Sequence, residues 1–207
     1  MDKRGQWSWS GALQGGPGDR RCVALTFDDG PEPPFTDEIL DQLELTGTPA
    51  TFFVIGKKAK QWPHLIERMA AAGHIVGNHT QHHRHPYLQP FAARQGIIDG
   101  AATIERILGK RPRWLRPPWG LYPAWLWGPT RATGQTPVAW TVEALDFLRP
   151  GSEMIAKRIV RAARPGSIIL LHDGGGDRSQ TVGALPMIIS GLRRQGYQFV
   201  TLAELIE

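Results

Sequence analysis

The chain has 207 residues, 41% of them hydrophobic and 21% charged, a composition that is typical of a globular protein and argues against disorder. Its length suits one domain with a sizeable core. A net charge of +5 favours anionic surroundings, although charge spread in this way also serves solubility, and no run of Lys or Arg indicates nucleic-acid binding. The only cysteine, Cys22, excludes an intrachain disulfide and a cysteine-based zinc site.

Residues 1–21 begin the chain as a polar, glycine-rich segment, and we expect an extended arm or linker there, followed by one domain at 22–207. No apolar stretch near the start is typical of a signal peptide. The strongest apolar run, at 168–171, is far too short to span a membrane. We therefore expect no membrane span in this chain.

Strand-like and helix-like stretches alternate from residue 22 onward. The strand-like runs lie at 23–27, 51–55, 75–77, 114–116, 138–142, 167–171 and 199–201. The helix-like stretches lie at 36–46, 62–72, 91–108, 152–163 and 182–195, whereas 121–134 is a poor helix or a loop. This alternation predicts an α/β fold with a mainly parallel sheet or an incomplete barrel of about seven strands, close to the eight of a complete (β/α) barrel.

Ionisable side chains end or closely follow five of the strand-like runs. They are Asp28 with Asp29, His79, Arg116, Asp146, and His172 with Asp173. In parallel α/β folds the functional site lies where the C-terminal ends of the strands meet their loops. We therefore expect these side chains to gather at one end of the fold.

Asp28 and Asp29 close the first strand-like run, directly before Gly30-Pro31. Neighbouring strand residues point to opposite faces, so the two carboxylates can share one site only where the chain already turns. Two carboxylates this close resist joint ionisation unless a cation is present. The pair therefore predicts one metal ligand and one base, and the alternative is a strand-ending Asx turn.

Four of the seven histidines fall between residues 79 and 85. In a helical turn, His79 and His83 would lie on one face, about 5–6 Å apart at Cβ, which suits two nitrogens on one zinc ion. His82 competes for this role, and His85 is weaker because six positions correspond to about 240° around a helix. Two imidazoles with one carboxylate form a three-ligand site with an open position, and the alternative is a solvated polar loop.

His172 follows an apolar run and can supply a general acid, because histidine titrates near neutrality; the alternative is a structural histidine. Arg116 opens a rigid turn that contains two prolines. Its guanidinium can pair with Asp28 or with Asp146, either within a site or as an ordinary structural ion pair.

These residues belong to five motifs that occur in order: TFDDGP at 26–31, HTQHH at 79–83, RPPWG at 116–120, WTVEALDF at 140–147 and LLHD at 170–173. In this respect the chain resembles the polysaccharide deacetylases of carbohydrate esterase family 4, over residues 23–206. The resemblance implies a distorted, incomplete (β/α) barrel of seven strands, so that 22–207 is a polysaccharide deacetylase domain. It also implies hydrolysis of acetyl groups on N-acetylated sugars of chitin or peptidoglycan, or on O-acetylated xylan.

The resemblance also implies residue roles. Asp28 is the general base, oriented by Arg116, and His172 is the general acid, tuned by Asp146. A divalent metal, with zinc first and Co, Ni, Mn or Fe as alternatives, is held by Asp29, His79 and His83. The backbone N–H of Trp119, a position where the family more often has Tyr, helps to stabilise the oxyanion. Leu170 lines the pocket for the acetyl methyl group.

Two further positions depart from the family pattern. Phe147 stands where the family usually has Trp, and Glu143 stands where it often has Asp. These changes bear on pocket shape and not on the metal ligands. Trp119, Trp125 and Trp127 cluster in one stretch and are candidates for sugar contacts, since aromatic faces suit sugar rings; the alternative is packing beneath the loop.

The expected partner is an acetylated polysaccharide, peptidoglycan first and chitin oligomers next, bound by a monomer and without nucleic acid. The expected location is extracellular or at a bacterial cell wall, with any export or anchoring segment absent from this chain; a cytoplasmic location stays open. Two rival functions are a metal amidohydrolase acting on small amides and a non-catalytic carbohydrate-binding domain on the same fold.

Overall fold

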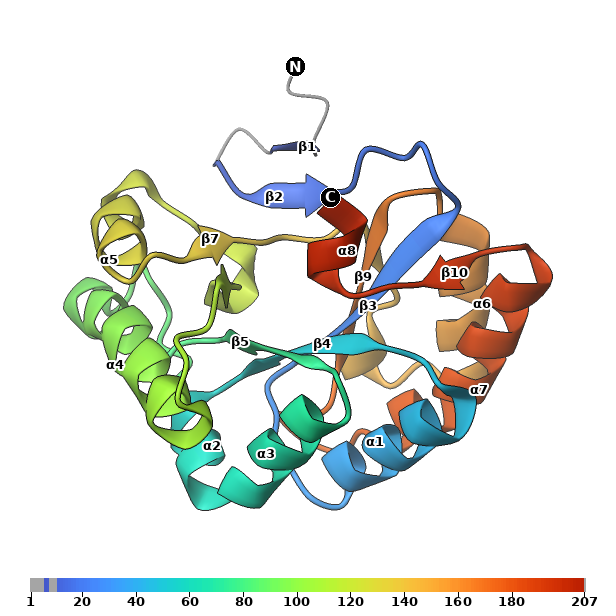
Figure 1. Ribbon diagram of the computed structural model, residues 1–207, viewed down its shortest axis with the longest axis horizontal. Helices are drawn as coiled ribbons and strands as arrows, with labels where there is room; N and C mark the ends of the chain where they lie inside the picture. Colours follow the sequence, from blue (N-terminus) through green and yellow to red (C-terminus); the bar gives the residue numbers. More distant parts are fainter. Residues whose placement is uncertain (1–5, 8–10, 207) are drawn as a thin grey trace.

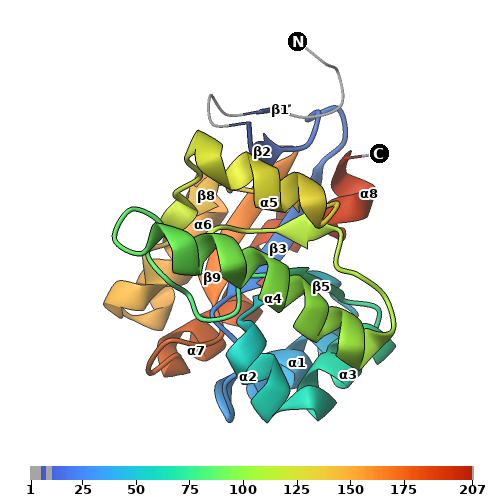
Figure 2. The same cartoon turned by 90° about the vertical axis from the view of Figure 1, so that its left-hand side faces the viewer.

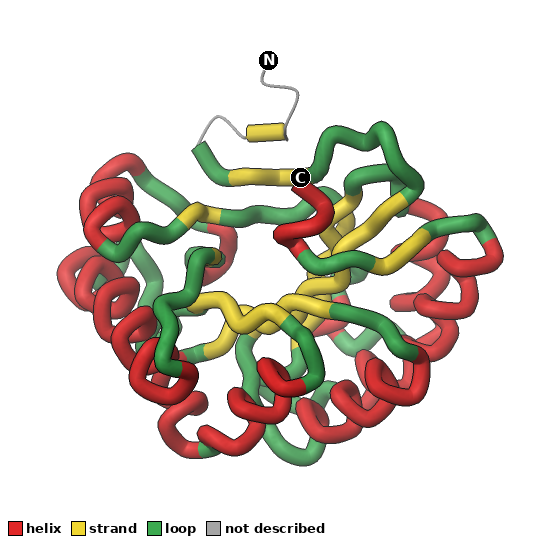
Figure 3. The backbone as a smooth tube through the Cα atoms, viewed as in Figure 1, coloured by secondary structure: helices red, strands yellow, loops and turns green. Residues whose placement is uncertain are grey.

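The computed structural model describes residues 6–7 and 11–206. Seven parallel strands form one curved sheet in the order β8–β9–β3–β4–β5–β6–β7. Their bounds are β3 Cys22–Asp28, β4 Ala50–Val54, β5 Ile75–Asn78, β6 Trp114–Leu115, β7 Thr136–Pro137, β8 Val142–Glu143 and β9 Ser167–His172. Figures 1 and 3 show these strands surrounding the centre of the molecule with helices outside them, which confirms the predicted incomplete (β/α) barrel.

Three short strands complete the sheet: β1 Gln6–Trp7, β2 Leu13–Gly15 and β10 Gln198–Phe199. β2 pairs antiparallel with β9, and Leu13 also bridges to Val138, which follows β7. The N-terminal segment thus spans the gap between β7 and β9, so that the barrel is nearly closed.

The outer layer consists of helices that follow the strands. Their bounds are α1 Phe35–Thr46, α2 Gly56–Gln61, α3 Pro63–Ala71, α4 Pro90–Leu108, α5 Trp127–Ala132, α6 Ser152–Ala162, α7 Ser179–Arg194 and α8 Leu202–Ile206. Figure 2 shows α4 and α5 stacked on one side of the barrel. Gly47 and Gly109 take left-handed backbone angles just after α1 and α4, as helix C-caps commonly require.

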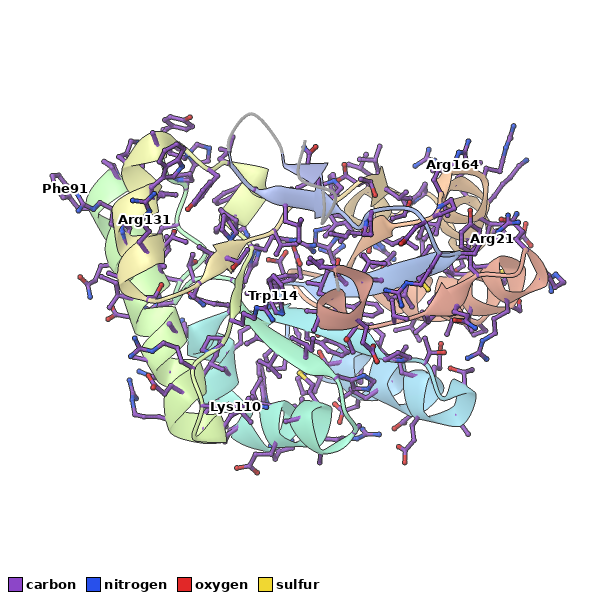
Figure 4. The ribbon with its side chains drawn as sticks, turned by 45° about the horizontal axis from the view of Figure 1, so that its top comes forward. Arg21, Phe91, Lys110, Trp114, Arg131 and Arg164 are labelled. Atoms are coloured by element: carbon purple, nitrogen blue, oxygen red, sulfur yellow. The ribbon has the colours of Figure 1, made fainter. Side chains whose placement is uncertain are left out.

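The core has two layers, because side chains of a strand alternate between its faces. In β3, Val23, Leu25 and Phe27 pack outward against the helices, whereas Ala24 lies in a second cluster inside the barrel. That inner cluster includes Trp114, near the centre of Figure 4, whereas Phe91 and Arg164 lie at the periphery. By the same alternation, Asp28 at the end of β3 shares the inward face with Ala24, so its carboxylate lies at the mouth of the barrel.

The N-terminal end of the barrel is covered by α8, whose Leu202 and Leu205 pack into the inner cluster. In Figure 1 this helix lies in front of the strands. The opposite end, where β3 and β9 bring Asp28 and His172 into register, remains free for a site.

Several predicted bounds need correction. The expected strand at 138–142 is divided, because the chain forms β7 and β8 with an isolated bridge at Val138 between them. Helices α2 and α8 were not expected, and α5 forms within the stretch described as a poor helix or a loop. The expected arm at 1–21 lies partly outside the described residues, and its residues 13–15 form β2. Within the part of the chain that the structure describes, no helix has the length and apolar character needed to cross a membrane.

Candidate active site and metal centre

The two adjacent carboxylates reach one cavity because the chain leaves the strand between them. Asp28 is the last residue of β3, and Asp29 has a left-handed backbone conformation with φ +75°. Few residues other than glycine adopt such angles, and those that do cluster at functional sites. In a regular strand the two side chains would point to opposite faces. The turn at Asp29 breaks this alternation, so that Asp28 and Asp29 line the same cavity.

The histidines join this cavity from the loop after β5. His79 is buried, and its Nδ1–H donates to the backbone carbonyl of Arg116 at 2.6 Å, which leaves Nε2 directed at the carboxylates. His83 approaches the same atoms, whereas His82 is exposed. The segment is not the expected helical turn: left-handed angles at Thr80 and His83 bring the two rings together, with centroids 4.9 Å apart.

Asp29, His79 and His83 converge on one point. Asp29 Oδ1 lies 3.4 Å from His79 Nε2 and 3.2 Å from His83 Nε2, and one ligand atom from each residue lies within 4.8 Å of the others. Although Asp29 Oδ1 is buried, it accepts no well-directed hydrogen bond within the described chain. An unsatisfied buried oxygen between two imidazole nitrogens suits a divalent cation. These three residues therefore fit the expected metal.

The pKa shifts at this centre show which of the three ligands already favour the deprotonated form that a metal requires. Burial raises the pKa of Asp29, but interaction with His79 and His83 outweighs this effect and leaves the pKa below its ordinary value. Burial and the charge of His79 lower the pKa of His83 to about 4. Burial lowers the pKa of His79, whereas Asp28 and Asp29 raise it further than burial lowers it. A cation among these groups would compete with the proton on His79, because metal ligands must be deprotonated.

The second carboxylate, Asp28, is bound to a buried arginine instead. Arg116 Nη1 donates to Asp28 Oδ1 at 2.8 Å and to Thr26 Oγ1 at 2.7 Å. The guanidinium lies 4.2 Å over the ring of Phe53, and Nη2 donates to the carbonyl of Ala139. Of the two partners considered for Arg116, the structure thus selects Asp28, whose Oδ2 lies 3.8 Å from His79 Nε2.

His172 has a carboxylate partner of its own. Its Nδ1–H donates to Asp146 Oδ1 at 2.8 Å, and its backbone N–H donates to Asp146 Oδ2 at 2.9 Å. Thr181 Oγ1 also donates to Asp146 Oδ2 at 2.8 Å. Burial lowers the pKa of His172, but the hydrogen bond and charge of Asp146 raise it above its ordinary value. His172 therefore holds a proton more firmly than a free histidine, with Nε2 available to the cavity.

The cavity that these groups share has a volume of about 500 Å³. Besides the acidic and histidine side chains, it is lined by Trp119, Gly120, Trp140, Glu143, Leu145, Phe147 and Leu170. Trp119 is half exposed and packs against His83, with ring centroids 4.3 Å apart. Trp119 and Leu170 thus lie where the resemblance implied.

The other two candidate tryptophans lie outside this cavity. Trp125 packs against the small hydrophobic cluster beneath α4, and Trp127 lines a neighbouring cavity of about 460 Å³ together with Tyr87 and Tyr122. The two cavities share Gly120. For Trp125 the packing alternative describes its contacts.

Sequence reasoning missed Thr181 and Trp140. Thr181 lies in the first turn of α7, far from the motif that it supports, and no local pattern indicates its bond to Asp146. Trp140 lines the cavity and belongs to the WTVEALDF motif, which also contains Asp146. Membership of that motif was the available signal.

Carboxylates and histidines thus converge at one end of the barrel strands, an arrangement that suits metal-assisted hydrolysis. Comparison with known proteins agrees with this class of site. The sequence profile of polysaccharide deacetylases matches residues 15–138, more than half of the chain. The chain therefore belongs to the polysaccharide deacetylase family.

Two curated relatives illustrate this membership. A peptidoglycan-N-acetylglucosamine deacetylase of Bacillus cereus is 38% identical over 193 residues, covering 92% of this chain and 90% of the relative. A chitooligosaccharide deacetylase of Sinorhizobium fredii is 40% identical over 189 residues, covering 84% and 87%.

Two solved structures share the fold. The crystal structure of a peptidoglycan N-acetylglucosamine deacetylase has a TM-score of 0.88 and 34% identity, covering 93% of this chain and 91% of that chain. A carbohydrate esterase family 4 pseudoenzyme from Bacillus anthracis has a TM-score of 0.86 and 26% identity, covering 95% and 69%. This fold therefore occurs in a deacetylase and in a pseudoenzyme, so catalysis depends on the residues of the site and not on the fold alone.

Proposed function

We propose that the chain is a metal-dependent hydrolase that removes acetyl groups from N-acetylated polysaccharide. The observation that carries this proposal is the convergence of three units on one cavity: the Asp28–Arg116 pair, the His172–Asp146 pair and the Asp29, His79, His83 cluster. A base, an acid and a cation site in one cavity are what hydrolysis of an unactivated amide requires.

Asp29, His79 and His83 would hold a divalent cation, with zinc first, and when bound it would polarise the acetyl carbonyl and acidify water. Asp28 takes the proton from the attacking water, because Arg116 holds one of its oxygens and leaves the other facing the cavity. His172 protonates the leaving amine through Nε2, while Asp146 holds its Nδ1–H. The backbone N–H of Trp119 is our candidate donor to the oxyanion.

For the substrate we propose a glycan of several sugar units, with peptidoglycan first and chitin oligomers next. Leu170 lines the catalytic cavity and would contact the acetyl methyl group. The cavity at Trp127 adjoins the catalytic cavity at Gly120, so a glycan could extend from one into the other. Its aromatic side chains would offer flat faces to further sugar units. The named activities of the two curated relatives support these two substrates. The peptidoglycan deacetylase also favours action at a bacterial cell wall.

The rival functions differ from this proposal at identifiable residues. A non-catalytic binding domain would not need the charged partners of Asp28 and His172, yet both have them at 2.8 Å. A small-amide hydrolase would not need the aromatic cavity beyond Gly120.

The test is acetate release from N-acetylglucosamine oligomers, peptidoglycan, acetyl-xylan and small acetamides. We expect release from the acetylated glucosamine oligomers or peptidoglycan, increasing with chain length. Turnover of small amides alone would support the amidohydrolase. Glycan binding without release of acetate would support the binding domain.

A further inference from the structure

The backbone at Asp29 is held by contacts that lie outside the cluster of Asp29, His79 and His83. Asp29 takes a left-handed conformation that residues other than glycine rarely adopt. Such a conformation persists only where the surroundings fix it. The groups that fix it therefore decide where its carboxylate points.

Lys58 supplies one such contact from α2. Its Nζ donates to the backbone carbonyl of Asp29 at 2.8 Å and also forms an ion pair with Glu32 Oε2. Lys58 is partly buried, whereas Lys57 and Lys60 on the same helix are exposed. The bond thus joins α2, which follows β4, to the turn after β3 that carries the candidate metal ligand.

Glu32 extends this contact to a third loop. Its Oε2 accepts a hydrogen bond from the backbone N–H of Gly175 at 2.8 Å, in the loop after β9. Burial raises the pKa of Glu32, but Lys58 and the Gly175 N–H outweigh this and keep it below its ordinary value, so the side chain is a carboxylate.

The glycine loop packs directly against the Asp29 turn. A Cβ atom at Gly174 would lie 2.4 Å from the Asp29 carbonyl oxygen, and one at Gly175 would lie 2.9 Å from Asp29 Oδ2. No side chain fits between these loops. Asp29 therefore lies between the glycine loop and the Lys58 ammonium.

We propose that Lys58 and Glu32 are positioning residues that lock the Asp29 turn and so preorganise its carboxylate for a cation shared with His79 and His83. Neither side chain faces the catalytic cavity, so both act through Asp29. The inference rests on the proposed metal site. Outer partners of metal ligands fix ligand orientation, and their loss typically costs about 10–100-fold in metal affinity.

The test measures Zn²⁺ affinity of the whole protein by competition with a chromophoric chelator. We expect Lys58→Met to weaken binding by about 10–100-fold. Lys58→Arg should restore most of the affinity, because a guanidinium can still donate to both oxygens. Lys60→Met is the matched control on the same helix and should bind as the wild type does.

A second readout separates positioning from general damage to the fold. For Lys58→Met, the Zn²⁺ concentration that gives half-maximal acetate release should rise by the same factor, while kcat at saturating Zn²⁺ stays near the wild-type value. A low kcat that saturating Zn²⁺ does not restore would overturn the inference.

Equal affinities of Lys58→Met and the wild type would also overturn it, as would an equal loss in Lys60→Met. If circular dichroism shows that Lys58→Met does not fold, Glu32→Gln decides: weaker Zn²⁺ binding supports the inference, and unchanged binding refutes it. A wild-type protein that binds no Zn²⁺ would refute the metal site itself, so the two failures are distinguishable.

Discussion

The different roles of the two neighbouring aspartates can be tested by removing one charge at a time. Asp28→Asn and Asp29→Asn are nearly isosteric, and each changes a single carboxylate. Asp29 Oδ1 lies within 3.4 Å of both ring nitrogens, whereas Asp28 Oδ1 is bonded to Arg116 and its Oδ2 is 3.8 Å from the nearer histidine. We therefore expect opposite phenotypes from two adjacent positions.

For Asp28→Asn, the amide oxygen can still accept from Arg116, but a neutral amide cannot take a proton from water. General base catalysis is worth about 10²–10⁴-fold, and kcat should fall by that factor with metal content unchanged. Stability should fall by about 1.5–3 kcal/mol at most, the usual worth of a hydrogen bond to a charged group.

For Asp29→Asn, a ligand of a three-residue site loses its charge. Zn²⁺ affinity should fall by more than the roughly 10–100-fold that outer-shell partners contribute. The assay is metal content by elemental analysis, with kcat measured on both variants at a fixed free Zn²⁺ concentration. If Asp28→Asn empties the site while Asp29→Asn keeps its metal, the assignment of base and ligand is wrong.

Other residues give three further expectations. Asp146→Asn should shift the alkaline limb of the pH–rate profile to lower pH, because Asp146 raises the pKa of His172 and activity is lost as pH rises through that pKa; an unchanged limb would contradict this. His83→Ala should lower metal content sharply while His82→Ala leaves it intact, and the reverse result would assign the ligand to His82. Arg116→Met should cost about 3–5 kcal/mol in urea unfolding, because it leaves a buried carboxylate unpaired; a loss under about 1 kcal/mol would refute the structural importance of this pair.

The sequence was most informative where strands end. Asp28, His79, Arg116 and His172 each end or directly follow a strand-like run, and parallel strands bring such positions to one end of the barrel whatever the details of the loops. This is why the site residues could be grouped before their distances were known. The fold class followed from the same alternation of strands and helices.

Contacts between loops could not be predicted in this way. The helical spacing proposed for His79 and His83 was wrong about the backbone, because left-handed residues bring the rings together instead. α2 lacks the apolar periodicity that would reveal a helix, so the bond from Lys58 to the Asp29 carbonyl had no signal in the sequence. Trp125 shows the same limit, because aromatic composition alone does not separate a sugar contact from core packing.

The most direct test of the account is metal dependence of acetate release by the wild-type protein. The protein is stripped with a strong chelator, checked for residual metal by elemental analysis, and assayed on N-acetylglucosamine oligomers before and after addition of Zn²⁺. The cluster of Asp29, His79 and His83 predicts that the stripped protein releases no acetate and that Zn²⁺ restores release. Full activity in a preparation shown to be free of metal would contradict the proposed function.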